Sequence, residues 1–192
     1  RSLHAIGDES ERLEALVTDL LDLAKLEARR FRLDLDAVDG NSLVDRAFQA
    51  YAGEAARRDM TYEQELIPLP SLFTDEARVR QIVGNLIDNA FRWAPDGGTV
   101  RVSAHPRPGG GAVIIVADNG PGISVDRQME IFEPFRSENT PDGQHGSGLG
   151  LAISRQLARA LGGDLRVESR LGSGSRFILE LPAEARQTTL AR

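Results

Sequence analysis

Apolar residues recur at three- and four-residue spacing near the start of the chain, the pattern of one face of an amphipathic helix. The pattern runs over residues 8–30, where acidic residues and arginines separate the apolar positions Leu13, Leu16, Val17, Leu20, Leu21, Leu23 and Leu26. An ordinary core helix would show such a stripe. A stripe this rich in leucine fits one helix of a dimeric bundle better, because it has to be buried against a partner.

Helical and strand patterns alternate through the rest of the chain. Period-two alternation and short apolar runs predict strands over residues 32–38, 62–66, 99–104, 112–117, 165–169 and 176–181. Helices are predicted from an Asn41 or Ser42 cap to about residue 58, from an Asp75 cap onward, from about residue 125, and over residues 149–160. Strands 99–104 and 112–117 form a hairpin, and the chain from Pro182 onward is predicted to fray. This order indicates an α/β fold, a layered sheet with helices on one face.

Composition and charge exclude several classes of protein. The 192 residues suffice for one ordinary domain plus an appendage. With 23 basic and 29 acidic residues the net charge is −6, which argues against a nucleic-acid binder. The chain has no cysteine, so it has neither disulfides nor thiolate metal sites. No apolar run approaches the ~20 residues that cross a bilayer.

Two clusters of residues offer oxygen ligands. Asn85 and Asn89 lie four apart on the helix predicted after Asp75, so both carboxamides point the same way, and their oxygens suit a hard cation such as Mg²⁺. Asp118 ends the apolar run 112–117 and is followed at once by a glycine turn. A carboxylate accepts a hydrogen bond from the exocyclic N–H₂ group of adenine but not from the carbonyl group of guanine. Asp118 would therefore distinguish the two bases. The alternative is an ordinary turn after a strand, for which Asp-Asn-Gly is common.

A third cluster suits phosphate. The glycine loop 146–150 runs into an apolar helix, so free backbone N–H groups and the positive helix end would face an anion. The three clusters in this order predict a nucleotide site. The P-loop motif and the motifs of eukaryotic-type protein kinases are absent from the sequence, which excludes those two classes.

Together the clusters resemble the ATP-binding catalytic region of sensor histidine kinases, whose GHKL or Bergerat fold is shared with gyrase, the Hsp90 chaperones and the mismatch-repair ATPases. The resemblance covers about residues 33–182. It rests on an N box (81–90), a first glycine box (118–123), a phenylalanine box (132–135), a second glycine box (146–151) and a closing glycine turn (172–177). It implies a two-layer α/β sandwich, here preceded by a long N-terminal helix. That helix resembles the second helix of the kinase dimerisation hairpin.

The resemblance also implies roles for single residues. Asn85 and Arg92 would be catalytic, Asn89 would bind Mg²⁺, and Trp93 would lie against the nucleotide, although the family more often carries lysine and tyrosine at positions 92 and 93. Trp93 as plain core is the alternative. Residues 132–148 resemble an ATP lid, with Phe132 and Phe135 as its apolar anchor. The implied ATP-binding set is Asn85, Asn89, Arg92, Trp93, Asp118, Gly120, Gly122, Ile123, Phe132, Phe135, Arg136, Gly146, Ser147, Gly148, Leu149 and Gly150.

The nature of the reaction follows from Asn85. The gyrase and Hsp90 branch carries a glutamate there that activates water, whereas an amide has no useful basicity. Hydrolysis should therefore be slow, which favours transfer of the ATP γ-phosphoryl group to a histidine for relay to a response-regulator aspartate. Neither His4, His105 nor His145 stands in the family's acceptor motif. The acceptor is therefore expected outside this chain, which would bind ATP without phosphorylating itself.

Two alternatives to a sensor histidine kinase remain at this stage. A serine kinase of the anti-sigma type is disfavoured by the helix at 8–30, and a non-catalytic nucleotide-binding or docking module is disfavoured by the intact boxes.

In the sensor-kinase hypothesis, residues 1–31 would be part of the dimerisation hairpin, 32–184 the catalytic domain and 185–192 a flexible tail. The implied partners are ATP with Mg²⁺, a cognate response regulator and a second copy in the full-length kinase, with no nucleic acid. The resemblance implies the cytoplasmic part of a bacterial sensor that reaches the membrane only through other segments.

Overall fold

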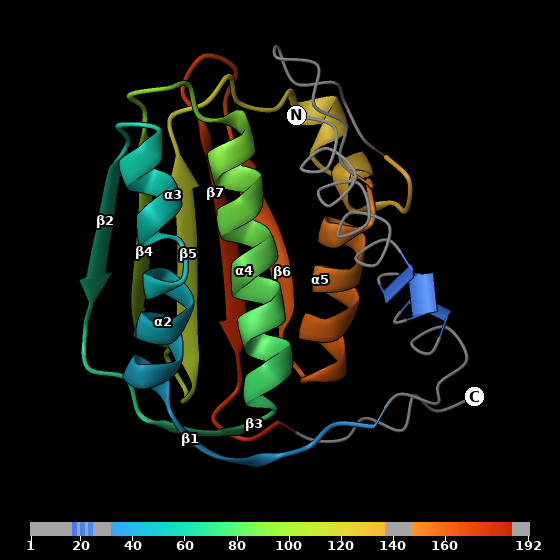
Figure 1. The fold of residues 1–192 in the computed structure, drawn as a ribbon. Helices are drawn as coiled ribbons and strands as arrows, with labels where there is room; N and C mark the ends of the chain where they lie inside the picture. Colours follow the sequence, from blue (N-terminus) through green and yellow to red (C-terminus); the bar gives the residue numbers. More distant parts are fainter. Residues whose placement is uncertain (1–16, 19, 22, 25–31, 137–146, 186–192) are drawn as a thin grey trace, which may run out of the picture.

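A mixed five-stranded sheet forms one layer of the molecule (Figure 1). The computed structural model describes residues 17, 18, 20, 21, 23, 24, 32–136 and 147–185. The strand order is β2-β4-β5-β7-β6, with β2 parallel to β4 and the other pairs antiparallel. The strands are β2 (Thr61–Leu66), β4 (Thr99–Pro106), β5 (Ala112–Asp118), β6 (Asp164–Ser169) and β7 (Ser175–Leu181). The predicted hairpin of β4 and β5 is confirmed.

Helices cover one face of this sheet (Figure 1). They are α2 (Gly40–Gln49), α3 (Ala52–Arg57), α4 (Glu76–Trp93) and α5 (Gly150–Ala160). The main core lies between the two layers and includes Leu86 and Ile153 from the helices and Ile114 and Phe177 from the sheet, all at most 1% exposed. The predicted two-layer sandwich with helices on one face is therefore confirmed.

The opposite face of the sheet has a small apolar centre and a charged border. Val113, Ile115 and Ile178 form a separate buried cluster there. Ion pairs between neighbouring strands flank it, among them Arg101 with Glu63 at 2.7 Å. Arg166 with Glu180 and Arg176 with Glu168 also join β6 to β7, while Arg166 pairs with Glu168 within β6 and Arg107, just after β4, pairs with Glu180 on β7.

A second, two-stranded sheet was missed by the sequence prediction. β1 (Asp36–Asp39) pairs antiparallel with β3 (Ser71–Thr74), which directly follows the prolines at 68 and 70. The end of the chain packs on β3: Phe73 N donates to Ala183 O (2.8 Å), and Ala185 N donates to Phe73 O (2.7 Å). The prediction that the chain frays from Pro182 is therefore wrong up to the buried Ala185. Residues 186–192 lie outside the described part.

Three predicted elements need correction. The strand predicted over 32–38 is confined to β1. The cap of α2 is Asp39, whose carboxylate accepts from Ser42 N (2.7 Å), whereas Asn41 Oδ1 accepts from Leu69 N (2.7 Å). The helix predicted to reach residue 58 is broken at Tyr51 into α2 and α3. The helix predicted from about 125 consists of two 3₁₀ turns, η1 (Val125–Arg127) and η2 (Glu130–Phe132).

Most of the predicted N-terminal helix lies outside the described residues. The six residues described there are all helical. Leu23 is 5% exposed and belongs to the main core, whereas Val17, Leu20 and Leu21 are each more than half exposed. The division into a hairpin helix, a catalytic domain and a tail stays a prediction. Within the part that the structure describes, no helix combines the length and apolarity needed to span a bilayer.

Candidate nucleotide site

Helix α4 places four of the predicted site residues. It begins at the predicted cap, because the buried Asp75 carboxylate accepts from Arg78 N (3.1 Å) and also from Asp34 N (2.9 Å). One face of the helix is buried in the core, so Asn85 and Asn89 on another face are only partly buried. The last turn carries the exposed Arg92 and the partly buried Trp93.

Asn85 joins α4 to α5. Its Nδ2 donates to Gly150 O (3.3 Å) and to the hydroxyl of Ser154 (3.2 Å), a side chain that is fully buried. Both hydrogen bonds hold the amide nitrogen toward α5. The arrangement therefore fixes the carboxamide plane and directs its oxygen away from these two partners.

Asp118 is the last residue of β5 and lies between β4 and β7, opposite Val100 and Ser175. Burial raises the pKa of its carboxyl group to about 6, although hydrogen bonds from Gly120 and Ser175 oppose the shift. The Gly120 N–H donates to Oδ1 at 2.8 Å. A partly buried carboxylate that can accept hydrogen bonds thus stands at the end of the central strands.

The first glycine box packs tightly against its neighbours. A Cβ on Gly120 would lie 2.7 Å from the carbonyl oxygen of Trp93, at the end of α4. Gly122 has φ +73° and lies against Arg170, in the turn between β6 and β7. From the same turn, Gly174 approaches the Asp118 carbonyl so closely that a Cβ would be 1.9 Å from the oxygen. The predicted closing glycine turn therefore forms one wall behind Asp118.

Two side chains that the sequence prediction missed hold the loop after Asp118. The Ser169 hydroxyl accepts from Ile123 N (2.8 Å) and donates to Gly174 O (2.7 Å). The Gln128 amide nitrogen donates to Ile123 O (3.1 Å) and to Ser169 O (2.9 Å). Neither residue stands in a motif, and their role depends on strands that meet only in the folded chain.

The two described ends of the lid meet at Gly148. Phe135 N donates to Gly148 O (2.9 Å), and Gly148 has φ +68°. Phe132 is partly buried, and the Arg155 guanidinium lies 4.7 Å from its ring centre. Phe135 is 66% exposed with φ +63°, so the prediction that both rings anchor the lid is wrong for Phe135. Arg136 pairs with Glu133 at 3.2 Å.

The described part of the second glycine box leads into α5. The Ser147 hydroxyl accepts from Leu149 N (3.2 Å), and the buried Leu149 stands directly before Gly150, the first residue of α5. The first N–H groups of this helix have no partner inside the helix and favour an anion. Gly146 and His145 lie outside the described residues.

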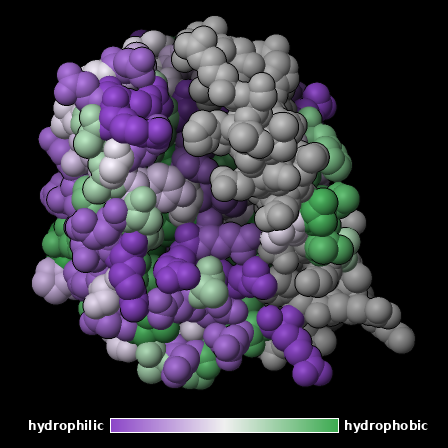
Figure 2. Space-filling model, viewed as in Figure 1, coloured by the Kyte–Doolittle hydropathy of each residue, from purple (hydrophilic) through white to green (hydrophobic). Residues whose placement is uncertain are grey.

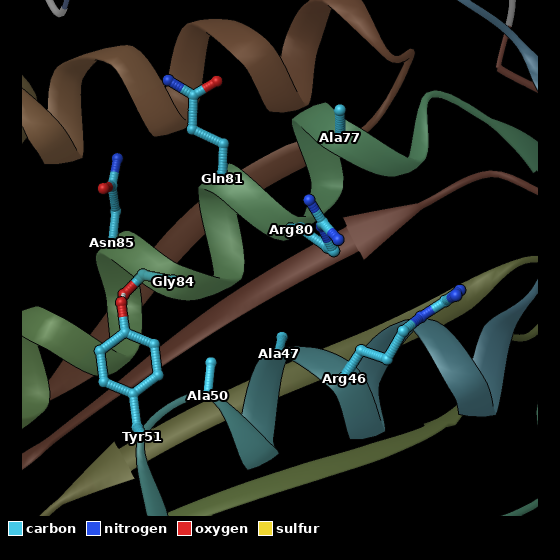
Figure 3. Close-up of a pocket in the computed structure, with 9 residues that line it drawn as sticks. All are labelled: Arg46, Ala47, Ala50, Tyr51, Ala77, Arg80, Gln81, Gly84 and Asn85. Carbon is cyan, nitrogen blue, oxygen red and sulfur yellow. Dashed lines mark hydrogen bonds between the residues drawn. The ribbon is translucent and has the colours of Figure 1, made fainter. Parts of the chain in front are cut away.

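A groove of about 530 Å³ lies between α4 and α2. Its lining is Arg46, Ala47, Ala50, Tyr51, Ala77, Arg80, Gln81, Gly84 and Asn85 (Figure 3). The Tyr51 hydroxyl crosses to α4 and donates to Gly84 O (3.1 Å). Only Asn85 is common to the groove and the predicted site. The described part of this helix-bearing face is mostly hydrophilic (Figure 2).

Comparison with known proteins identifies the family. The model of the histidine kinase-, DNA gyrase B- and HSP90-like ATPases matches residues 74–185, which include α4, Asp118 and α5. The chain belongs to this family. The match begins one residue before the cap of α4 and ends at the last described residue, Ala185.

Individual relatives are sensor kinases. The alginate biosynthesis sensor protein KinB of Pseudomonas aeruginosa is 33% identical over 181 residues, which are 94% of this chain and 30% of KinB. The swarming motility regulation sensor protein RssA of Serratia marcescens is 35% identical over 189 residues, 96% of this chain and 40% of RssA. The chain thus spans less than half the length of these two relatives.

Solved structures of other proteins support the same family assignment. Full-length ShkA in complex with AMPPNP superposes with a TM-score of 0.84 at 33% identity, covering 98% of this chain and 40% of ShkA. The mycobacterial sensor histidine kinase MprB gives 0.67 at 31% identity, covering 79% of this chain and 99% of that structure. The domain described here is the catalytic ATP-binding domain of a sensor histidine kinase.

Proposed function

We propose that this kinase domain binds ATP where α4, the turn 118–123 and the start of α5 meet. The observation that carries the proposal is the convergence of three sequence-distant segments. Asn85 is hydrogen-bonded to α5, and Gly120 is packed on the end of α4 beside Asp118. Asp118 accepts from the adenine amine, and the N–H groups at the start of α5 together with Arg92 hold the phosphates. The other predicted ATP-binding residues line this space in the proposal.

The donor groups fit Mg²⁺ bound together with the nucleotide. Asn85 and Asn89 lie one helical turn apart and offer amide oxygens, which with phosphate oxygens and water suit this cation. Among the described residues, no group of three histidine, cysteine or acidic side chains could hold a metal by itself. We assign Asn89 as the protein ligand, with Asn85 beside it. The cation would neutralise negative charge on the phosphates.

Asn85 favours transfer to a protein side chain over hydrolysis. Its amide nitrogen donates two hydrogen bonds to α5, and an amide does not take a proton from water at neutral pH. The domain's own contribution is therefore positioning of the phosphoryl group, with Arg92 offering a guanidinium to its charge. An incoming imidazole needs no general base, because its neutral nitrogen carries a lone pair.

The histidine that receives the phosphoryl group lies on another segment of the kinase in this proposal. Within the described residues, His105 stands at the far end of β4 from the residue that pairs with Asp118, about 17 Å along the strand. His4 and His145 lie outside the described part. The phosphoryl group then passes to the aspartate of a response regulator, and the full-length kinase works as a homodimer.

Calorimetric titration tests the nucleotide site. We expect saturable binding of ATP with Mg²⁺, no binding of GTP, and at least tenfold weaker ATP binding in Asp118→Ala. Asp36→Ala is the matched control, because this exposed aspartate lies in β1. ATP binding that survives in Asp118→Ala would contradict the adenine assignment. In the full-length kinase, Arg92→Met and Asn89→Ala should each lower histidine phosphorylation from [γ-³²P]ATP.

A further inference from the structure

Arg58 lies directly after α3 and reaches across to the end of α4. Its guanidinium donates from Nη1 to Phe91 O, from Nη2 to Ala94 O (3.0 Å) and from Nε to the Asp96 carboxylate (2.9 Å). The Arg58 side chain is only 24% exposed, and its two hydrogen bonds to the carbonyl groups are partly buried, whereas the Asp96 side chain is 82% exposed. One side chain therefore contacts the last turn of the helix and the loop that follows. In Figure 1 α3 lies beside this end of α4.

The sequence of α4 leaves its last turn in need of such a donor. In a continuing helix the carbonyl of Phe91 would accept from the N–H of residue 95, but residue 95 is proline and has no N–H. Ala94 already has ψ 139°, outside the helical region, as expected before a proline. A cation at this position also opposes the partial negative charge of the helix end.

The backbone strengthens the same connection. Gly97 N donates to Arg58 O (3.3 Å), and Thr61 N donates to Gly98 O (2.8 Å), so the loop after α4 is held to the start of β2. That loop is joined in turn to the first glycine box, because Thr99 N donates to Asn119 Oδ1 (2.8 Å). The carbonyl of Trp93, one residue before Ala94, is the group on which Gly120 packs.

We infer that Arg58 is a positioning residue for the nucleotide site. It replaces the hydrogen bond that Pro95 cannot supply and so holds the last turn of α4, with Arg92 and Trp93, in place against Gly120 and Asp118. The inference rests on the proposed function for the roles of Arg92 and Trp93. The placement of Trp93 by Arg58 is a property of the ligand-free domain and is tested separately.

The test compares Arg58→Met with Arg57→Met. Methionine keeps the apolar stem of the side chain and removes every donor. Arg57 is the adjacent arginine, is mostly exposed and pairs within α3 with Glu54, so it serves as the matched control. Arg58→Lys keeps the charge but has a single donor group in place of the fork. Measurements are made well below each variant's unfolding temperature.

Trp93 is the single tryptophan of the sequence, so its emission reports directly on the last turn of α4. We expect Arg58→Met to shift and broaden the ligand-free emission and to weaken Mg·ATP binding by about tenfold or more. Arg57→Met should leave both unchanged, and Arg58→Lys should restore only part of each. A folded Arg58→Met with unaltered emission and affinity would overturn the inference. If Arg58→Met does not fold, the ligand-free emission and the Mg·ATP affinity are measured on Arg58→Lys instead, with the same expected direction.

A double-mutant cycle separates positioning from general destabilisation. In an Arg92→Met background, the affinity lost on adding Arg58→Met should shrink, because part of that loss acts through Arg92. Fully additive losses would overturn positioning through Arg92. Failure of the unaltered chain to bind ATP would instead contradict the proposed function, while the ligand-free emission would still decide the role of Arg58.

Discussion

Asp118 is already partly buried in the ligand-free domain, and burial raises the pKa of its carboxyl group to about 6. The adenine amine needs an acceptor, so the nucleotide binds the ionised form and competes with the proton. We predict that ADP binding weakens about tenfold between pH 7 and pH 5. Calorimetric titrations across this range measure it, with adenosine as a second ligand because it has no titrating phosphate. An affinity that does not change with pH would show that Asp118 is not the adenine acceptor.

The same pKa sets a pH dependence of stability in the ligand-free domain. The folded pKa lies above the ordinary value of 3.8, so the folded state holds the proton more tightly than the unfolded chain. The contribution of Asp118 to the free energy of unfolding therefore falls as the pH rises from about 4 to about 6. Asp118→Asn should lack this fall and, at pH 7, be more stable by up to about 3 kcal/mol, while losing ATP binding. Urea unfolding of both proteins measures it, and a stability difference between them that is the same at pH 4 and pH 7 would contradict it.

Gly174 supports Asp118 from behind at a position where other residues do not fit. With φ +81° and the Asp118 carbonyl 1.9 Å from where a Cβ would be, Gly174→Ala should lower the free energy of unfolding by at least about 2 kcal/mol. Gly53→Ala in α3 is the control, since no atom lies within 4 Å of its Cβ position, and it should stabilise by about 0.5–1 kcal/mol. Urea denaturation of both variants measures these changes. A Gly174→Ala variant with an unchanged free energy of unfolding would contradict the close packing of Gly174 on Asp118.

Helices α4 and α5 are joined at the site by the hydrogen bonds of Asn85. Ser154→Ala removes one acceptor of its amide nitrogen and leaves only Gly150 O. We predict that Mg·ATP binding weakens severalfold because the carboxamide turns more freely, while the free energy of unfolding changes by only about 1 kcal/mol. The exposed Ser173→Ala is the control. A large loss of stability with unchanged Mg·ATP affinity would show that Ser154 contributes to core packing and not to the nucleotide site.

Elements with a strong local pattern were predictable from sequence, and those fixed by contacts were not. Helix α4 has both a capping aspartate and a regular apolar face, and its start was predicted correctly at Asp75. β3 escaped prediction because its four residues gain their strand conformation by pairing with β1 and with the end of the chain. The break at Tyr51 has only Gly53, two residues further on, as a local signal. A tertiary contact accompanies the break, since the Tyr51 hydroxyl donates to the Gly84 carbonyl on α4.

The same distinction holds within the site. Asp118 and the glycines could be proposed from the sequence because each box is contiguous and the family resemblance names it. Ser169, Gln128 and Arg58 were missed because each acts on a segment that is distant along the chain, through a single side chain in no motif. A proline directly after the end of α4 was the one local signal that an outside donor would be needed there.

The whole molecule has one deep core and one open sheet face, and these two should contribute unequally to stability. The core side buries the apolar faces of α2, α3, α4 and α5 against the sheet, whereas the open face has only a small apolar centre bordered by exposed ion pairs. Buried apolar side chains contribute several times more than exposed ion pairs do, because water screens the charges. The helix layer therefore determines whether the site is assembled at all.

A double-mutant cycle on the open face measures this difference. Arg101 and Glu63 stand directly opposite each other on β4 and β2, joined by two hydrogen bonds, yet each side chain is about half exposed. We predict a coupling free energy of about 0.2–1 kcal/mol from Arg101→Ala, Glu63→Ala and the double variant. Leu157→Ala in α5, at a fully buried position, should cost about 2–5 kcal/mol in the same urea-unfolding experiment. A coupling above about 2 kcal/mol would mean that the charged face holds the sheet together as strongly as the core does.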